Sequence, residues 1–153
     1  HPLCADKGSD EANSDFLNMC ICGHARQTLY ISPEGRMLPC MPLSSVPAQE
    51  GFPLVQDAGL AAGLTDSVYM DLITATVADY FDHNPECAAC EHRFQCAGGC
   101  RGSALLDGSD DLMGRDPAMC LLYRGGYAER VREAASAAVA AKAEHAGEDG
   151  ANA

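Results

Sequence analysis

Four cysteines fall close together in the spacing Cys87-x2-Cys90-x5-Cys96-x3-Cys100. Thiolates are soft, strongly donating ligands, and four of them suit zinc or iron in tetrahedral sulfur coordination. A Cys-x2-Cys pair presents two sulfurs from one turn, and Gly98-Gly99 allows the backbone to fold closely before the last cysteine. The spacing predicts a fold organised by metal. Taken alone, it fits a four-cysteine zinc site as well as an iron–sulfur site.

The cysteine count also bears on the cellular compartment. The chain has 9 cysteines in 153 residues. A disulfide framework needs an oxidising compartment and usually an even number of cysteines. Nine is odd, and the chain opens His1-Pro2-Leu3-Cys4 without a basic and then apolar leader. We therefore expect metal ligation rather than disulfides, a cytoplasmic protein, and a chain that is a fragment or a trimmed or processed product.

The charge balance excludes several classes of protein. Lys and Arg total 10 and Asp and Glu total 22, so the formal net charge is −12. Sequence-independent nucleic-acid binders and proteins that dock on anionic membranes need an excess of cationic side chains. No apolar run approaches the roughly 20 residues that span a bilayer. The length indicates one domain, with or without extended tails. With no Trp, 4 Phe and 5 Tyr, the fold is expected to depend on its metal.

A β-hairpin is predicted over residues 27–40. Residues 27–32 are rich in β-branched and aromatic side chains, as strands are. The sequence Ser32-Pro33-Glu34-Gly35 places proline at the second position of a turn and glycine at the fourth. Residues 36–40 would return as the partner strand and end at Cys40.

Helical patterns occur between residues 57 and 83. A short helix is expected over residues 57–64. Apolar residues then recur at helical spacing, which predicts one longer helix that begins at Thr65 or Asp66 and ends at residues 83–85. Residues 41–54 contain three prolines and are expected to form a loop.

A further helix is expected near the C-terminus. Asp116-Pro117 is typical of an N-cap followed by proline at the first helical position. Cys120 is therefore expected in the first turn. The helix continues past an irregularity predicted at Gly125-Gly126 into an Ala-rich stretch.

The complete cysteine pattern resembles the SPASM domain, the C-terminal auxiliary-cluster domain of many radical S-adenosylmethionine (SAM) enzymes. The signature of that family is Cys-x(9–15)-Gly-x4-Cys, a gap, Cys-x2-Cys-x5-Cys-x3-Cys, a gap and a last cysteine. The residues that meet it here are Cys22, Gly35, Cys40, Cys87, Cys90, Cys96, Cys100 and Cys120.

The resemblance implies a small α+β fold in which a β-hairpin, helices and long loops are organised around two [4Fe–4S] clusters. It implies that the first cluster is ligated by Cys22, Cys40 and Cys100, with a fourth position that varies in the family. For this position Cys20 is the nearer candidate and Cys4 the more distant one, and an open site is the third possibility. The ligands implied for the second cluster are Cys87, Cys90, Cys96 and Cys120.

The chain is expected to divide into four parts. Residues 1–19 are expected to be a linker or an irregular approach, 20–125 the auxiliary-cluster domain, 126–146 an Ala-rich helix and 147–153 a disordered tail. Arg101 follows a ligand cysteine, so its guanidinium is a candidate donor to cluster sulfide, an interaction that raises a cluster's reduction potential.

Enzymes of this family modify peptides or proteins, including peptides of RiPP biosynthesis, and their auxiliary clusters transfer electrons or bind substrate. Their SAM-binding cluster is held by Cys-x3-Cys-x2-Cys in an N-terminal barrel, and that motif is absent from this chain. We therefore expect the chain to be inactive alone, with SAM bound only in the missing catalytic domain. The implied partners are the barrel, on the same or a separate chain, and a peptide or protein substrate.

Two alternatives remain open at this point. The first is a zinc-stabilised, cysteine-rich binding module without a redox role. The second is a stand-alone electron-transfer or peptide-binding partner that acts in trans with a separate SAM enzyme.

Overall fold

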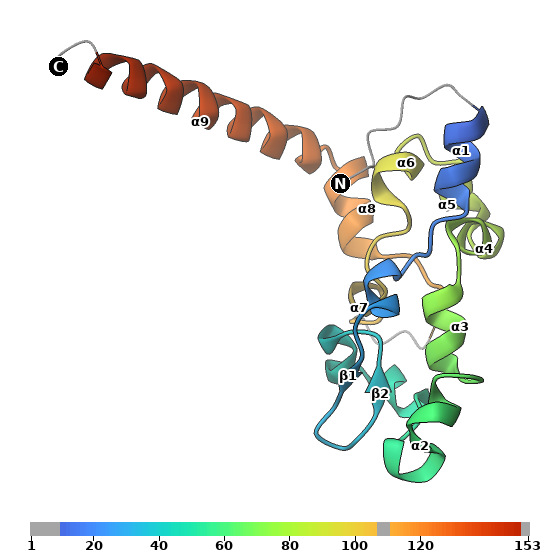
Figure 1. Ribbon diagram of the computed structural model, residues 1–153. Coiled ribbons are helices and arrows are strands. Elements are labelled where there is room, and N and C mark those ends of the chain that lie inside the picture. The colour runs from blue at the N-terminus through green and yellow to red at the C-terminus, as the bar shows by residue number, and fades with distance from the viewer. Residues whose placement is uncertain (1–9, 107–110, 151–153) are drawn as a thin grey trace. The chain divides into compact units, whose positions relative to one another are not determined.

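A two-stranded hairpin, a series of short helices and one long C-terminal helix form the described part of this small α+β protein, residues 10–106 and 111–150 of a computed structural model (Figure 1). The strands are β1 (Tyr30–Ile31) and β2 (Met37–Leu38). The 3₁₀ turns are η1 (Gly23–Arg26), η2 (Met41–Ser45) and η3 (Pro47–Gly51). The α-helices are α1 (Asp10–Leu17), α2 (Val55–Gly63), α3 (Val68–Thr74), α4 (Val77–His83), α5 (Pro85–Ala88), α6 (Arg93–Cys96), α7 (Arg101–Ala104), α8 (Pro117–Arg124) and α9 (Tyr127–Gly150).

The predicted hairpin is confirmed, with shorter strands than expected. β1 and β2 pair antiparallel in the register Tyr30 with Leu38 and Ile31 with Met37. The turn is closed by the backbone N–H of Gly35, which donates to the carbonyl of Ser32 at 2.9 Å. Gly35 has a φ of +88°, a conformation that glycine adopts at little cost. The turn residues read from the sequence therefore specify this connection.

The single long helix expected up to residue 83 is wrong, because the chain forms two helices there. α3 begins after Ser67, whose hydroxyl accepts from the backbone N–H of Met70. α4 begins after Thr76, whose side chain and backbone exchange hydrogen bonds with Asp79 in a capping box. Thr76 also pairs with Cys20 in an isolated antiparallel bridge. Because the helix is interrupted here, the segment before the hairpin pairs with the connection between α3 and α4.

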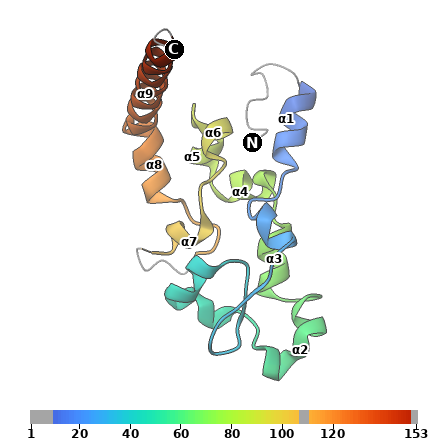
Figure 2. The ribbon, with the colours of Figure 1, turned by 60° about the vertical axis from the view of Figure 1, so that its left-hand side comes forward.

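Residues 1–19 were expected to be irregular, and this expectation is wrong over Asp10–Leu17, which form α1. The helix packs against α4 (Figure 2). Its Phe16 is 7% exposed and lies 5.1 Å from the ring of Phe94 and 6.2 Å from that of Phe81. The buried ring of Phe16 therefore anchors this helix. A single apolar side chain of this kind gives no helical periodicity that could be recognised in the sequence. Residues 1–9 lie outside the described residues.

Residues 41–54 were expected to form a loop, and they contain the turns η2 and η3. Each turn has a proline in its first positions, where the missing N–H of proline costs nothing. The prolines that suggested a loop therefore start short turns.

Two groups of buried side chains make up the core. The first lies around the hairpin, η2 and α3 and contains Ala25, Leu38, Leu43, Val46, Phe52, Tyr69, Leu72, Ile73 and Leu105. The second lies around α1 and α4 and contains Phe16, Val77, Tyr80 and Phe81. Cys22 and Cys40 pack against the first group and Cys87 against the second, so the core itself places cysteines from different parts of the chain.

The chain divides into two compact units, His1–Met119 and Cys120–Ala153. The predicted cap of α8 is confirmed, since Oδ1 of Asp116 accepts from the backbone N–H of Met119 at 3.0 Å. The irregularity expected at Gly125-Gly126 separates α8 from α9. α9 continues to Gly150, beyond residue 147, where the tail was expected to begin. Residues 151–153 lie outside the described residues. Among the described helices, none has both the length and the apolar character needed to cross a bilayer.

Candidate metal centre

The cysteines expected to ligate the first cluster, Cys20, Cys22, Cys40 and Cys100, are called the first set. Besides burial, the thiols of Cys40, Cys100 and Cys20 raise the pKa of Cys22, and the thiol of Cys100 also raises the pKa of Cys40. The fold therefore brings these thiols into one region, although they come from before the hairpin, from the end of β2 and from the start of α7. Cys20, Cys22, Cys40 and Cys100 are not in disulfide bonds.

The turn after Cys22 is held by a buried tyrosine. The hydroxyl of Tyr69 in α3 donates to the carbonyls of Ala25 at 3.0 Å and Thr28 at 3.3 Å. Tyr69 is 2% exposed, so these two hydrogen bonds connect η1 and the residues after it to the buried core. The backbone N–H of Ala25 in turn donates to the carbonyl of Cys22 at 2.9 Å. The position of Cys22 therefore follows from the packing of α3.

Cys40 and Cys100 come together because α7 packs against η2 (Figure 2). Cys40 is the N-cap residue of η2, and Cys100 is that of α7. Gly102 permits the close approach, since a Cβ at this position would lie 2.9 Å from Cβ of Pro42 and 3.8 Å from the sulfur of Cys100. A side chain here would push α7 away from η2.

Within the first set, the thiols of Cys22 and Cys40 are partly desolvated, whereas Cys100 is exposed. Burial raises the pKa of Cys22 to about 11, an effect that Cys40, Cys100 and Cys20 reinforce and the guanidinium of Arg101 opposes. Burial also raises the pKa of Cys40. Without metal these two groups therefore favour the protonated thiol. A bound metal ion would displace those protons, because thiolate is the form that ligates.

Cys20 is held by its backbone and by a cation. Its neighbour Ile21 donates from the backbone N–H to the carbonyl of Ala75 at 3.0 Å. Nη1 of Arg26 donates to the sulfur of Cys20 at 3.6 Å. Cys4, the other candidate for the fourth ligand of the first cluster, lies outside the described residues.

The cysteines expected to ligate the second cluster, Cys87, Cys90, Cys96 and Cys120, are called the second set. Cys87 lies in α5, and the N–H of Cys90 donates to its carbonyl at 3.2 Å, so the two are one turn apart. Cys96 ends α6, and Ala97 follows it with a φ of 49°. Cys120 lies in α8 and begins the second compact unit, so its relation to the other three stays a prediction.

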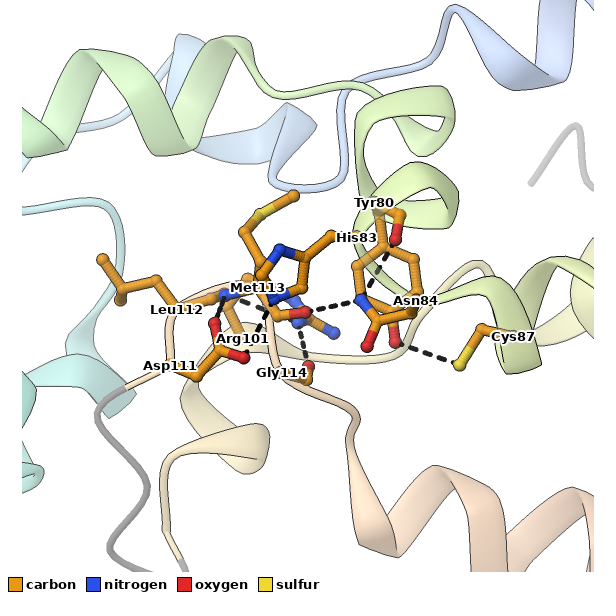
Figure 3. A network of polar contacts seen from close by, with 9 residues as sticks. All are labelled: Tyr80, His83, Asn84, Cys87, Arg101, Asp111, Leu112, Met113 and Gly114. Atoms are coloured by element: carbon orange, nitrogen blue, oxygen red, sulfur yellow. Dashed lines mark hydrogen bonds and ion pairs between the residues drawn. The ribbon is translucent and has the colours of Figure 1, made fainter.

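Arg101 is the largest fully buried side chain, with 2% of its surface exposed. Its guanidinium donates to the carbonyls of Gly98, Leu112 and Gly114. It also lies over the ring of Tyr80, 4.7 Å from the centroid (Figure 3). Its Nε is buried and has no acceptor within the part of the chain that the structure describes. A buried cation with a spare donor, next in sequence to Cys100 and near enough to Cys22 to lower its pKa, suits a negatively charged group with sulfur acceptors.

Tyr80 lies in the stretch where apolar residues recur at helical spacing, a pattern that predicts only burial in the core. The polar contact of its hydroxyl was not predicted. Its hydroxyl lies 3.4 Å from the sulfur of Cys87 (Figure 3). Burial and this contact raise the pKa of the phenol, and Arg101 opposes the rise. The spacing of Tyr80 and Cys87 carries no signal for such a contact, because a helix end and Pro85 separate them.

Histidines near the cysteines have other contacts. Nε2 of His83 lies 3.0 Å from a carboxylate oxygen of Asp111, and both side chains are about half exposed. Nε2 of His92 lies 3.8 Å from the carboxylate of Glu91. These two histidines therefore take part in surface ion pairs when protonated.

Across residues 10–106 and 111–150, no three His, Cys, Asp or Glu side chains converge as they would around a single metal ion. Around a cubane the ligand sulfurs stand farther apart, because each thiolate ligates a different iron atom. A cubane site therefore need not contain such a group.

Comparison with known proteins gives one relative. The chain is similar to the PqqA peptide cyclase of Gluconobacter oxydans (strain 621H), with 31% identity over 134 residues, which are 86% of this chain and 34% of that protein. The chain thus spans about a third of the length of the curated relative that it matches. No family model matches the chain, and no solved structure does. The comparison therefore relates the chain to part of an enzyme whose name describes the cyclisation of a peptide.

Proposed function

We propose that this chain is the auxiliary iron–sulfur domain of a radical SAM enzyme that modifies a peptide, and that it binds two [4Fe–4S] clusters. The observation that carries the proposal is the gathering of the first set by the hairpin, η2 and α7. Four soft donors from one region of the fold are the donor set that iron–sulfur clusters use.

The buried guanidinium of Arg101 supports the same proposal. Each cubane held by four thiolates carries a net charge of about −2 in its oxidised state. Arg101 interacts electrostatically with Cys22 and follows Cys100 directly, so its charge offsets part of that negative charge. Its spare Nε–H is the kind of donor that cluster sulfide accepts.

The similarity to a PqqA peptide cyclase supports a peptide as the substrate. In the proposed enzyme, the barrel that binds SAM lies outside these 153 residues, on the same or a separate chain. The role of this domain is to transfer electrons, to hold the substrate, or both. When bound, the clusters supply one-electron transfer. The chain supplies the cysteines that hold them, the cation beside them and the packed core that excludes water.

Anaerobic purification or reconstitution followed by metal analysis tests the proposal. The chain is expected to hold about 8 iron and 8 sulfide, as two cubane clusters require. It should also absorb broadly in the visible range, which zinc–thiolate sites do not. Stoichiometric zinc with little sulfide in protein purified without oxygen would instead support a zinc-stabilised binding module and overturn the proposal.

A further inference from the structure

Tyr80 offers a buried hydroxyl to one cysteine of the second set. The residue is 1% exposed, and its oxygen lies 3.4 Å from the sulfur of Cys87 (Figure 3). In the metal-free chain either atom can donate the hydrogen. A thiolate that ligates iron carries no proton, so in that state Tyr80 has to be the donor.

The ring of Tyr80 is held in place from two sides. The guanidinium of Arg101 lies over it, and Arg101 is itself fixed by carbonyls of Gly98 and Gly114. A Cβ at Gly98 would lie 2.7 Å from a ring carbon of Tyr80, so the backbone there contacts the ring directly. Packing therefore holds the hydroxyl near the sulfur of Cys87, and the side chain of Arg101 is its other polar neighbour.

The end of α4 is fixed in the same way. Nδ2 of Asn84 donates to the carbonyl of Tyr80 at 3.0 Å and to that of Met113 at 2.7 Å. These bonds tie the last turn of α4 to the segment that Arg101 also binds (Figure 3). The distance between Tyr80 and Cys87 is thus set by several interactions rather than by one rotamer.

We propose that Tyr80 is a positioning residue that donates a hydrogen bond to the ligand sulfur of Cys87 and thereby raises the reduction potential of the second cluster alone. The proposal rests on the proposed function and assigns a role to a residue outside the cysteine motif. Hydrogen bonds to ligand sulfur withdraw electron density from it and stabilise the reduced cluster, which is how they raise the potential.

The test is a redox titration of the full chain with both clusters in place, followed by electron paramagnetic resonance. Tyr80→Phe removes only the hydroxyl and keeps the ring that Arg101 contacts. It should lower the potential of one of the two reduction steps and leave the other unchanged, with iron and sulfide at wild-type content. The step that moves should be the one that is lost in Cys90→Ala.

Tyr69→Phe is the matched control. It also removes the hydroxyl of a buried tyrosine, but that hydroxyl donates to backbone carbonyls of Ala25 and Thr28. In Tyr69→Phe, the reduction step that is lost in Cys90→Ala should keep its wild-type potential. Unchanged potentials in Tyr80→Phe with both clusters present, or equal shifts of that step in both variants, would overturn the role of Tyr80.

If Tyr80→Phe loses iron, a second measurement tests the proposal. Site-specific 3-fluorotyrosine at position 80 keeps the hydroxyl and makes it a stronger donor, so the same step should move to higher potential. No shift, or a shift to lower potential, contradicts the proposal. If the wild-type chain holds no cubane, the proposed function itself fails and the role of Tyr80 fails with it, an outcome that metal analysis separates from the others.

Discussion

The buried carboxylate of Asp116 accepts a hydrogen bond from the backbone N–H of Cys100 at 2.9 Å. The same carboxylate accepts from the hydroxyl of Ser103 and from the backbone N–H of Met119, each at 3.0 Å. One side chain therefore satisfies donors at the start of α7 and at the start of α8. A residue predicted only as a helix cap thus also fixes the backbone of a proposed ligand.

Asp116→Ala is expected to destabilise the iron-loaded chain by about 2 to 4 kcal/mol. Loss of a helix N-cap costs about 1 kcal/mol, and leaving the N–H of Cys100 without its acceptor costs about 1 to 3 kcal/mol more. The measurement is a urea titration followed by circular dichroism. Asp66→Ala, which changes an exposed aspartate, is the control and should stay within about 0.5 kcal/mol of wild type. Equal stability of the two variants would contradict this role of Asp116.

Gly98→Ala is expected to cost more stability than Gly126→Ala. Both glycines have a positive φ, +82° and +74°, so alanine is strained at either position by about 1 to 2 kcal/mol. Only Gly98 has the ring of Tyr80 within 2.7 Å of the added Cβ, which adds about 1 to 3 kcal/mol of overpacking. Nothing lies within 4 Å of a Cβ at Gly126. Equal losses in urea titrations of the two variants would show that the ring moves away without cost.

The two proposed clusters should be separable by single substitutions. Cys96→Ala is expected to remove the second cluster and keep the first, and Cys40→Ala the reverse, because each leaves one ligand set intact. Each variant should then hold about 4 iron and 4 sulfide, the content of one cubane. Complete loss of iron in both variants would show that the two sets do not act separately.

The fourth ligand of the first cluster can be assigned in the same way. Cys20→Ala should perturb only the cluster that Cys40 serves, since Cys20 lies near enough to Cys22 to raise the pKa of its thiol. Cys4→Ala should leave both clusters intact. Loss of iron in the Cys4 variant with a silent Cys20→Ala would reverse the assignment. Paired iron analyses of the two proteins decide between them.

The chain alone is expected not to cleave SAM. Reductive cleavage needs a cluster with an open iron and a cavity that holds the sulfonium beside it, and the Cys-x3-Cys-x2-Cys motif is absent from these residues. Chromatography for 5′-deoxyadenosine, after incubation of the loaded chain with SAM and a strong reductant, makes the measurement. Robust formation of that product would mean that the chain is a catalytic unit.

Local chemistry made part of this fold predictable. The proline and glycine of the turn at 32–35 specify the hairpin, and Asp116-Pro117 specifies the start of α8. The gap at Gly125-Gly126 was also anticipated, because two glycines seldom continue a helix. Each of these features depends on a few adjacent residues.

Features that depend on distant contacts were not predictable. The segment before the hairpin bridges the α3–α4 connection through Cys20 and Thr76, and Phe16 of α1 is buried against rings of other helices. At the candidate site, the cysteine spacing identified the thiols and singled out Arg101. It gave no sign of the contact between Tyr80 and Cys87. Such contacts arise only when separate elements pack, so no local pattern records them.

The gathering of Cys22 with Cys100 also constrains how the protein is made. The first three thiols of the first set leave the ribosome well before Cys100, which becomes available only after α2 to α6 have been synthesised. Closing such a long loop costs little more entropy than closing a shorter one, so the distance along the chain is no thermodynamic obstacle. The order of synthesis, by contrast, delays the completion of the ligand set. A centre ligated by this set can be completed only once Cys100 has emerged, so a nascent chain that ends before α7 lacks one of the four proposed ligands.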